Sequence, residues 1–282
     1  MKPNLWQVDA FASRPFEGNP AAICVLEDFP CDDWMQSLAG EINLSETAYV
    51  VPGETATRFQ LRWFTPNTEV DLCGHATLAA AHVLNEQGRW NLTEPLVFET
   101  RSGDLTCLGG EHGITLDFPV SSLRKLDDAN QELREQLAAA FPSHSDEVQR
   151  AAIHETEFDL MLVFDRASSV HELVPNLALL QTIPTRGVMV TAPAESSQSD
   201  FVSRFFAPQC GIAEDPVTGS AHCALAPYWS QRLQKDELIG YQASQRGGYV
   251  RCEVQSDRVL LTGSAVTVLE SRMRIPIQTA LS

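Results

Sequence analysis

Two similar segments lie half a chain length apart in this sequence. The first begins with Arg62–Pro66 (RWFTP) and the second with Arg204–Pro208 (RFFAP), an offset of 142 residues in a chain of 282 residues. Each is followed by an acidic loop, a glycine with a polar neighbour, and a run of small apolar residues. Five matching features in one order favour an internal repeat over chance similarity between two aromatic strands. Because solenoid repeats are much shorter, the pattern predicts two similar lobes.

Each segment leads into a helix that we expect to be buried. Thr77–Leu84 and Ala221–Trp229 are small and apolar on nearly every side, which is typical of a helix enclosed by protein. Pro227 lies inside the second helix and cannot donate a hydrogen bond to the carbonyl four residues earlier. The sequence therefore predicts a kink or break between Cys223 and Pro227.

The starts of these two helices are candidate binding sites for an anion. Gly74 and His75 stand at the first start, and Gly219 and Ser220 stand at the second. The first N–H groups of a helix have no partner within it, and the helix start carries a partial positive charge. Because Gly219 has no side chain, a ligand can approach the backbone closely there. A carboxylate or phosphate is the expected occupant.

Charge and hydropathy exclude several classes of partner. Twenty basic against thirty-seven acidic residues give a net charge of −17, which argues against a nucleic-acid groove and against an anionic membrane surface. No apolar run approaches the roughly 18 residues of a membrane helix. The chain begins with a strand pattern and not with an apolar signal segment. We expect a cytoplasmic protein that binds neither nucleic acid nor membrane.

The sequence indicates neither a metal nor a cofactor. Its seven cysteines are scattered and form no CxxC pair, so neither a disulfide framework nor a structural zinc site is predicted. The regular alternation of strands and helices of a doubly wound sheet is absent, as are the GxGxxG and P-loop motifs. We therefore expect no nucleotide cofactor.

The order of predicted elements indicates an α+β protein in which strands wrap around one apolar helix in each lobe. The polar run Ser121–Asp128 is the best candidate for the crossing between lobes. The last apolar run, Ala265–Ile277, is strand-like and is expected to complete the first lobe. The expected bounds are 1–120 plus 265–282 for the N-terminal lobe and 121–264 for the C-terminal lobe.

Three side chains are candidates for acid–base chemistry. Glu46 is predicted to lie in a polar turn between a helix and a strand, where partial desolvation raises the pKa of a carboxyl group. His75 stands at a helix start, which favours a neutral imidazole that donates a hydrogen bond. Asp215 precedes the second helix, so it serves either as a capping carboxylate or as a ligand for a substrate amine or hydroxyl. A surface glutamate and a packed histidine are the alternatives for the first two.

Cys73 is a further candidate, because a thiol at a helix start has a lowered pKa and can act as a base or nucleophile. A racemase with two bases would need a second thiol at the matching place in the other repeat. That place holds Pro216 or Val217. The repeat therefore argues against Cys73 as an essential base.

Taken together, these segments resemble the PhzF-like phenazine-biosynthesis isomerase family, within the larger group that is similar to diaminopimelate epimerase and proline racemase. The resemblance covers the whole chain and is specific as an ordered set. The motifs that carry it are VDAFASRPFEGNPAAICVL, NLSETAYV, RWFTPNTEVDLCGHAT, RFFAPQCGIAEDPVTGSAH and GSAVTVLES.

The resemblance implies a diaminopimelate epimerase-like fold, with two pseudo-symmetric lobes that each curl a mixed sheet around a central helix. It also implies an active site in the cleft between the lobes, and cofactor-independent proton transfer on a small carboxylate metabolite. Glu46 matches the family's catalytic acid–base residue. The positions that hold or flank the substrate are matched by Gly74, His75, Asp215, Gly219 and Ser220. The assembled state is left open, with a homodimer as one candidate.

Cys73 departs from the phenazine enzymes, where a small residue is expected before the GH pair, and resembles the epimerase and racemase relatives. Three functions are consequently compared. The first is an isomerase that uses Glu46 as general acid and base. The second is an amino-acid racemase or epimerase that uses Cys73, and the third is a non-catalytic protein that binds a small acid.

Overall fold

The computed structural model describes residues 3–126 and 130–277, and the chain forms two compact units. Unit 1 comprises Met1–Phe118 and Leu260–Ser282, and unit 2 comprises Pro119–Val259. The predicted crossing at Ser121–Asp128 lies partly outside the described residues, and its described part belongs to unit 2. Among the helices described, none has the length and apolar character needed to cross a membrane.

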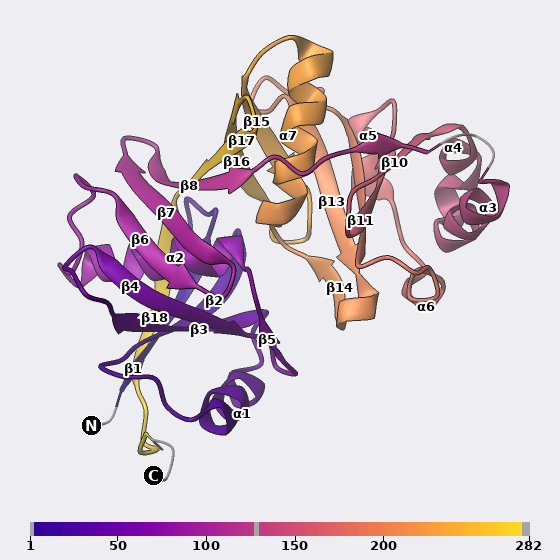
Figure 1. Cartoon of the computed structure of the whole chain (residues 1–282). Helices are drawn as coiled ribbons and strands as arrows, with labels where there is room; N and C mark the ends of the chain where they lie inside the picture. Colours follow the sequence, from indigo (N-terminus) through magenta and orange to yellow (C-terminus); the bar gives the residue numbers. More distant parts are fainter. Residues whose placement is uncertain (1–2, 127–129, 278–282) are drawn as a thin grey trace. The chain divides into compact units, whose positions relative to one another are not determined.

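Unit 1 is a mixed sheet with one helix enclosed by it and one helix on its other side (Figure 1). The sheet order is β18–β1–β2–β3–β4–β6–β7–β8, with parallel pairing only at β2–β3 and β4–β6 among these neighbours. The elements are β1 (Asn4–Ala10), β2 (Asn19–Val25), α1 (Asp32–Ile42), β3 (Glu46–Pro52), β4 (Arg58–Phe64), β5 (Glu69–Val70), α2 (Gly74–Glu86), β6 (Leu96–Thr100), β7 (Gly103–Gly110), β8 (Gly113–Pro119) and β18 (Ala265–Arg272). The last strand of the chain thus lies beside the first.

The central helix of unit 1 is α2, which contacts β1, β2, β3 and β18. Its buried positions include Ala76 and the run Ala79–Ala81, all without exposed surface. Small side chains allow strands to approach the helix closely on several sides, and this is why its sequence is apolar without a polar face. The helix α1 instead buries one face, including Trp34 and Leu38, as its amphipathic sequence predicts.

Unit 2 has the same plan. Its sheet order is β9–β10–β11–β12–β13–β15–β16, and α7 contacts β15 and β16. The elements are β9 (Arg124–Lys125), α3 (Gln131–Ala140), η1 (Pro142–His144), α4 (Ser145–Arg150), β10 (Ala152–Glu155), β11 (Asp159–Val163), α5 (Ala167–Glu172), α6 (Leu177–Leu180), β12 (Gly187–Pro193), β13 (Phe201–Ala207), η2 (Pro208–Cys210), β14 (Ile212–Asp215), α7 (Gly219–Leu233), β15 (Glu237–Gln242) and β16 (Gly248–Gln255). The strand β17 (Arg258–Gly263) follows and pairs with β8.

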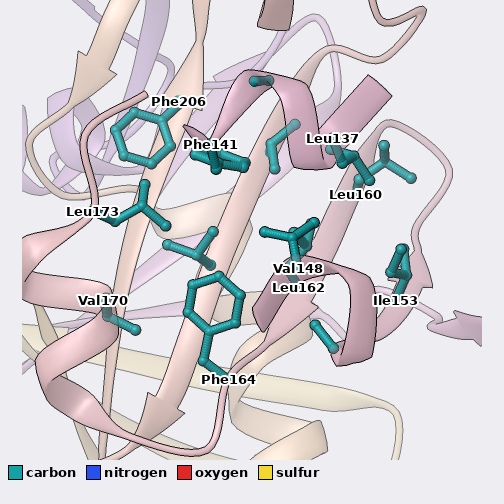
Figure 2. Close-up of a cluster of buried hydrophobic side chains, with 14 of the residues drawn as sticks. Leu137, Phe141, Val148, Ile153, Leu160, Leu162, Phe164, Val170, Leu173 and Phe206 are labelled. Carbon is teal, nitrogen blue, oxygen red and sulfur yellow. The ribbon is translucent and has the colours of Figure 1, made fainter. Parts of the chain in front are cut away.

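An apolar cluster of unit 2 lies between its sheet and the helices α3, α4 and α5 (Figure 2). Leu137 and Val148 come from α3 and α4, and they pack with Leu162 and Phe206 from the strands. Sequence reasoning missed α4, β10 and α5, because each has only four to six residues and so shows too little periodicity.

The internal repeat is visible in the pairing of strands. The series β1–β2–β3–β4–β6–β7 and β10–β11–β12–β13–β15–β16 share one alternation of antiparallel and parallel neighbours. The two arginines of the repeat make matching contacts as well. Arg62 pairs through two nitrogens with Glu69, and Arg204 pairs in the same way with Glu214, at 2.7–2.9 Å. Each of these glutamates lies on the short strand, β5 or β14, that follows the arginine strand. The segment predicted as an acidic loop therefore contains β14.

The predicted break between Cys223 and Pro227 is wrong, because α7 continues from Gly219 to Leu233, and the alternative, a kink there, stays a prediction. Pro227 has no N–H for the carbonyl of Cys223, which leaves that acceptor without its usual helical partner. The backbone N–H of Ser121 donates to this oxygen at 3.0 Å. The segment that follows β8 thus supplies the donor that Pro227 lacks, and α7 continues past Pro227.

A buried histidine in α7 should make the stability of unit 2 depend on pH. His222 has no exposed surface, its Nδ1 donates to the carbonyl of Thr218 at 2.8 Å, and its Nε2 has no hydrogen-bond partner among the described residues. Burial lowers the pKa of His222 to about 4, whereas the unfolded chain titrates near 6.5. Protonation therefore favours the unfolded chain as the pH falls from 6.5 to 4.

We expect the free energy of unfolding to drop by up to about 3 kcal/mol across this pH range. Urea titrations at several pH values measure it. His222→Asn keeps a donor toward Thr218 but cannot titrate, so its slope against pH should be flatter. Replacing the exposed His112 with Asn should leave the wild-type slope. An unchanged slope in His222→Asn would contradict the assignment.

Candidate functional site

The candidate acid–base residue Glu46 is the first residue of β3, and its partner in the parallel strand β2 is Ala21. The residue is only 8% exposed. The predicted polar turn is wrong at this point, because β3 begins earlier than its apolar run and brings Glu46 into the sheet. The carboxylate is thereby desolvated and attached to a rigid strand.

The side chain of His75, the second residue of α2, lies against this carboxylate. Its Nε2 is 3.0 Å from Oε2 of Glu46, and its Nδ1 is 3.1 Å from Nδ2 of Asn19 at the start of β2. Yet the direction of the contact does not make a hydrogen bond, and Oε2 of Glu46 has no hydrogen-bond partner within the described part of the chain. Oε2 of Glu46 can therefore still accept a hydrogen bond or a proton.

Cys73 completes a cluster at the start of α2. It occupies the N-cap position with an extended backbone, and its Sγ lies 3.6 Å from Nδ1 and 4.0 Å from Nε2 of His75. One donor atom from each of Glu46, Cys73 and His75 lies within 4.8 Å of the other two, so these residues could hold a metal ion. Three of the predicted site residues are therefore together in unit 1.

The neighbouring charges decide the proton positions in this cluster. Burial and the Glu46 carboxylate raise the pKa of Cys73 to about 11, so the residue is a thiol at neutral pH. Burial lowers the pKa of His75, but the neighbouring negative charge outweighs it and raises this pKa well above 6.5. The Cys73 sulfur and the Glu46 carboxylate, in that order, are the neighbouring groups that raise this pKa. The amide nitrogen of Asn19 can only donate, so its contact with Nδ1 fits an unprotonated Nδ1, and the neutral His75 expected from the helix start stays a prediction.

The predicted residue Asp215 is in unit 2, at the end of β14. Its Oδ2 accepts a hydrogen bond from the hydroxyl of Thr218 at 2.5 Å, and its carbonyl accepts one from Gln242. Gln242 also accepts from the backbone N–H of Thr218, the N-cap residue of α7. These contacts hold the turn that leads into α7.

Sequence reasoning missed Arg186, which contacts predicted residue Ser220. Nη2 of Arg186 donates to Oγ of Ser220 at 3.2 Å, and the same guanidinium pairs with Asp159. Asp159 is opposite Gly187 in the parallel pair β11–β12, just as Ala21 is opposite Glu46 in β2–β3. Arg186 stands one residue before Gly187, so superposing the repeats could have found it.

The two central helices also begin alike. The N-cap residues are Cys73 for α2 and Thr218 for α7, and neither accepts a side-chain capping hydrogen bond. Both N-cap residues are buried, so water cannot easily satisfy the first N–H groups. The structure thus aligns Cys73 with Thr218, and not with the Pro216 or Val217 expected from the sequence.

The comparisons with known proteins agree with this architecture. The family model described as "Phenazine biosynthesis-like protein" matches residues 8–271. An uncharacterized isomerase of Halalkalibacterium halodurans is 46% identical over 273 residues, covering 97% of this chain and 99% of that protein. A crystal structure of a PhzF family protein from Enterococcus faecalis is 38% identical with a TM-score of 0.86, covering 98% of this chain and 100% of that chain.

A more distant likeness shows the fold alone. A probable proline racemase of Agrobacterium radiobacter has a TM-score of 0.61 at 10% identity, over 97% of this chain and 93% of that chain. The two repeated units, with a central helix in each, are thus those of the diaminopimelate epimerase-like fold. On the match to its family model and relatives, the chain belongs to the phenazine biosynthesis-like (PhzF) family and is an isomerase.

Proposed function

We propose that the protein is a cofactor-independent isomerase that moves a proton on a small carboxylic acid, with Glu46 as general acid and base. The observation that supports this most is the state of Glu46. Its Oε2 is buried without a hydrogen-bond partner in the described residues, although His75 lies 3.0 Å away. Buried carboxylates with a structural role are usually fully hydrogen-bonded, so a buried carboxylate with only an imidazole close to this oxygen supports a role in proton transfer.

The proposed chemistry needs only this pair. Glu46 takes a proton from a carbon of the substrate, and the electron pair that remains is delocalised onto the adjoining carbonyl or enol. The carboxylic acid formed at Glu46 then returns the proton to another carbon, so the charge of the enzyme is restored. His75 lies 3.0 Å from Oε2, where it can hold the carboxyl group in place during the transfer.

We further propose that each uncapped helix start, Gly74–His75 of α2 and Gly219–Ser220 of α7, is a binding position for a small anion such as a carboxylate. Arg186 supports the second of these positions. Its N–H occupies an acceptor site of Ser220, which leaves the hydroxyl proton free to donate to an anion. Ser220 is then a donor that adds to the backbone N–H groups.

The racemase alternative has less support in the geometry. A thiol that acts as a base must ionise readily, whereas the environment of Cys73 raises its pKa to about 11. The matching N-cap position in unit 2 is Thr218, which has no thiol. A protein that merely binds a small acid would use the same helix starts, so chemistry on the ligand must separate it from an isomerase.

Replacing Glu46 with Gln should stop proton exchange. Small carboxylic acids, with aromatic and cyclohexadiene acids first, are incubated with the protein in deuterium oxide, and mass spectrometry measures deuterium on carbon. Because an amide cannot accept the proton, we expect Glu46→Gln to slow exchange by about 10²- to 10⁴-fold. Glu69→Gln is the matched control, since Glu69 is a half-buried carboxylate of the same unit that pairs with Arg62. Equal exchange by Glu46→Gln and wild type would exclude the mechanism, and a ligand that binds without exchanging would favour the binding protein.

Removing Arg186 should weaken binding of the anion. Sulfate, phosphate and the same acids are titrated while the melting temperature is recorded, because a ligand of the native state raises this temperature. We expect Arg186→Gln and Ser220→Ala each to weaken the apparent affinity about tenfold, with little further loss in the double variant because both act through one hydroxyl. Arg204→Gln removes an equivalent arginine–carboxylate pair of unit 2 and should keep the ligand shift. Additive losses in the double variant would show that Arg186 does not act through Ser220.

Cys73 should react slowly with alkylating reagents. At pH 7.5 a thiol with a pKa of about 11 is almost wholly protonated, and the residue is also buried. Iodoacetamide labelling followed by peptide mass spectrometry should therefore modify the exposed Cys210 well before Cys73. Raising the pH should increase the rate at which Cys73 is labelled relative to the rate for Cys210. If Cys73 were labelled first at pH 7.5, its thiol would be activated, and the racemase alternative would regain support.

A further inference from the structure

The cluster at the start of α2 contains the three donor types of a transition-metal site. A carboxylate oxygen, a thiol sulfur and an imidazole nitrogen come from Glu46, Cys73 and His75, which are 5–8% exposed. Across residues 3–126 and 130–277, this is the group of three such side chains whose donor atoms converge. We propose that the cluster binds one divalent ion of the zinc type, with these three residues as its protein ligands.

The distances are close to those that such an ion requires. Ligands at about 2.3 Å for sulfur and about 2.0–2.1 Å for nitrogen or oxygen, at tetrahedral angles, place S and N about 3.5 Å apart and N and O about 3.3 Å apart. Nε2 of His75 lies 4.0 Å from Sγ of Cys73 and 3.0 Å from Oε2 of Glu46. These two separations differ from the required ones by about half an ångström or less, and all three donor atoms lie within 4.8 Å of one another.

Charge favours the same ion. Binding requires that Cys73 lose its thiol proton and that Nε2 of His75 carry no proton, and the resulting thiolate together with the Glu46 carboxylate balances two positive charges. The buried cluster then becomes neutral, which matters because an unbalanced buried charge is costly. A thiolate and an imidazole select Zn²⁺ or Co²⁺ over Mg²⁺ and Ca²⁺, which prefer oxygen ligands.

Asn19 supplies the outer contact that a metal-binding histidine usually has. When Nε2 of His75 binds the ion, Nδ1 carries the proton and must donate it to an acceptor. The buried amide of Asn19 lies 3.1 Å from Nδ1, and its oxygen is the acceptor that this position would use when the ion is bound.

The ion would bind the Glu46 carboxylate, which otherwise accepts the proton from the substrate. Three protein ligands leave a fourth position open, as in metal sites that exchange ligands with solvent. If Glu46 is the acid–base residue proposed above, the bound ion blocks proton transfer and acts as an inhibitor. The inhibition rests on the proposed function, whereas the binding of the ion does not.

Cobalt titration of the chelator-treated full-length protein tests the binding directly, because Co²⁺ reports both tetrahedral geometry and thiolate ligation in its absorption spectrum. We expect a thiolate-to-cobalt band that saturates at one equivalent and disappears when Zn²⁺ is added. Cys73→Ser should abolish the band, and Glu46→Gln should weaken the affinity. Asn19→Ala should keep the band and weaken the affinity about 10- to 100-fold.

Cys210→Ser is the matched control, since Cys210 is an exposed cysteine outside the cluster. Its band should equal that of the wild type, and circular dichroism should show that every variant is folded. No tetrahedral cobalt spectrum in the wild type, or a band that survives Cys73→Ser, would overturn the proposal. Deuterium exchange provides the separate readout of function. Cobalt binding with no exchange on any acid would contradict the isomerase mechanism and leave the metal site standing.

Discussion

The burial of α2 and α7 is the constraint on which the rest of the structure depends. Each helix is enclosed by its own unit, and nine residues of each are buried. A helix in this position cannot expose its first N–H groups freely to water, and no side chain caps either start. Each apolar interior therefore contains one set of unpaired backbone N–H groups, at the start of its central helix. The candidate site residues lie at these two helix starts.

The repeat places different chemistry at equivalent points. Where the second strand of a parallel pair begins beside the start of the central helix, unit 1 has Glu46 with His75, and unit 2 has Arg186 with Ser220. One unit thus has a carboxylate beside an imidazole, and the other has a guanidinium, paired with Asp159, beside a hydroxyl.

Much of this could be predicted from the sequence, and the exceptions have physical reasons. Long periodic segments and the repeated RWFTP and RFFAP segments indicated the central helices and the lobes. The sequence could not show that Glu46 is inside β3, because the pairing with Ala21 is a contact between distant segments. It could not show the 3.0 Å contact of His75 with Glu46 either, since this contact joins the start of α2 to the start of β3. Arg186 was missed because a lone arginine in a loop carries no local pattern.

The pairing of β18 with β1 affects the order in which the chain can fold during synthesis. Unit 1 contains the first 118 residues, yet β1 lacks one of its neighbours until residues 265–272 have left the ribosome. Unit 2 is continuous in the chain and is complete before that strand emerges. The usual order, in which the N-terminal domain folds first, is therefore reversed for the finished units. Until β18 emerges, the open edge of β1 is a surface on which a nascent chain can pair with the wrong strand.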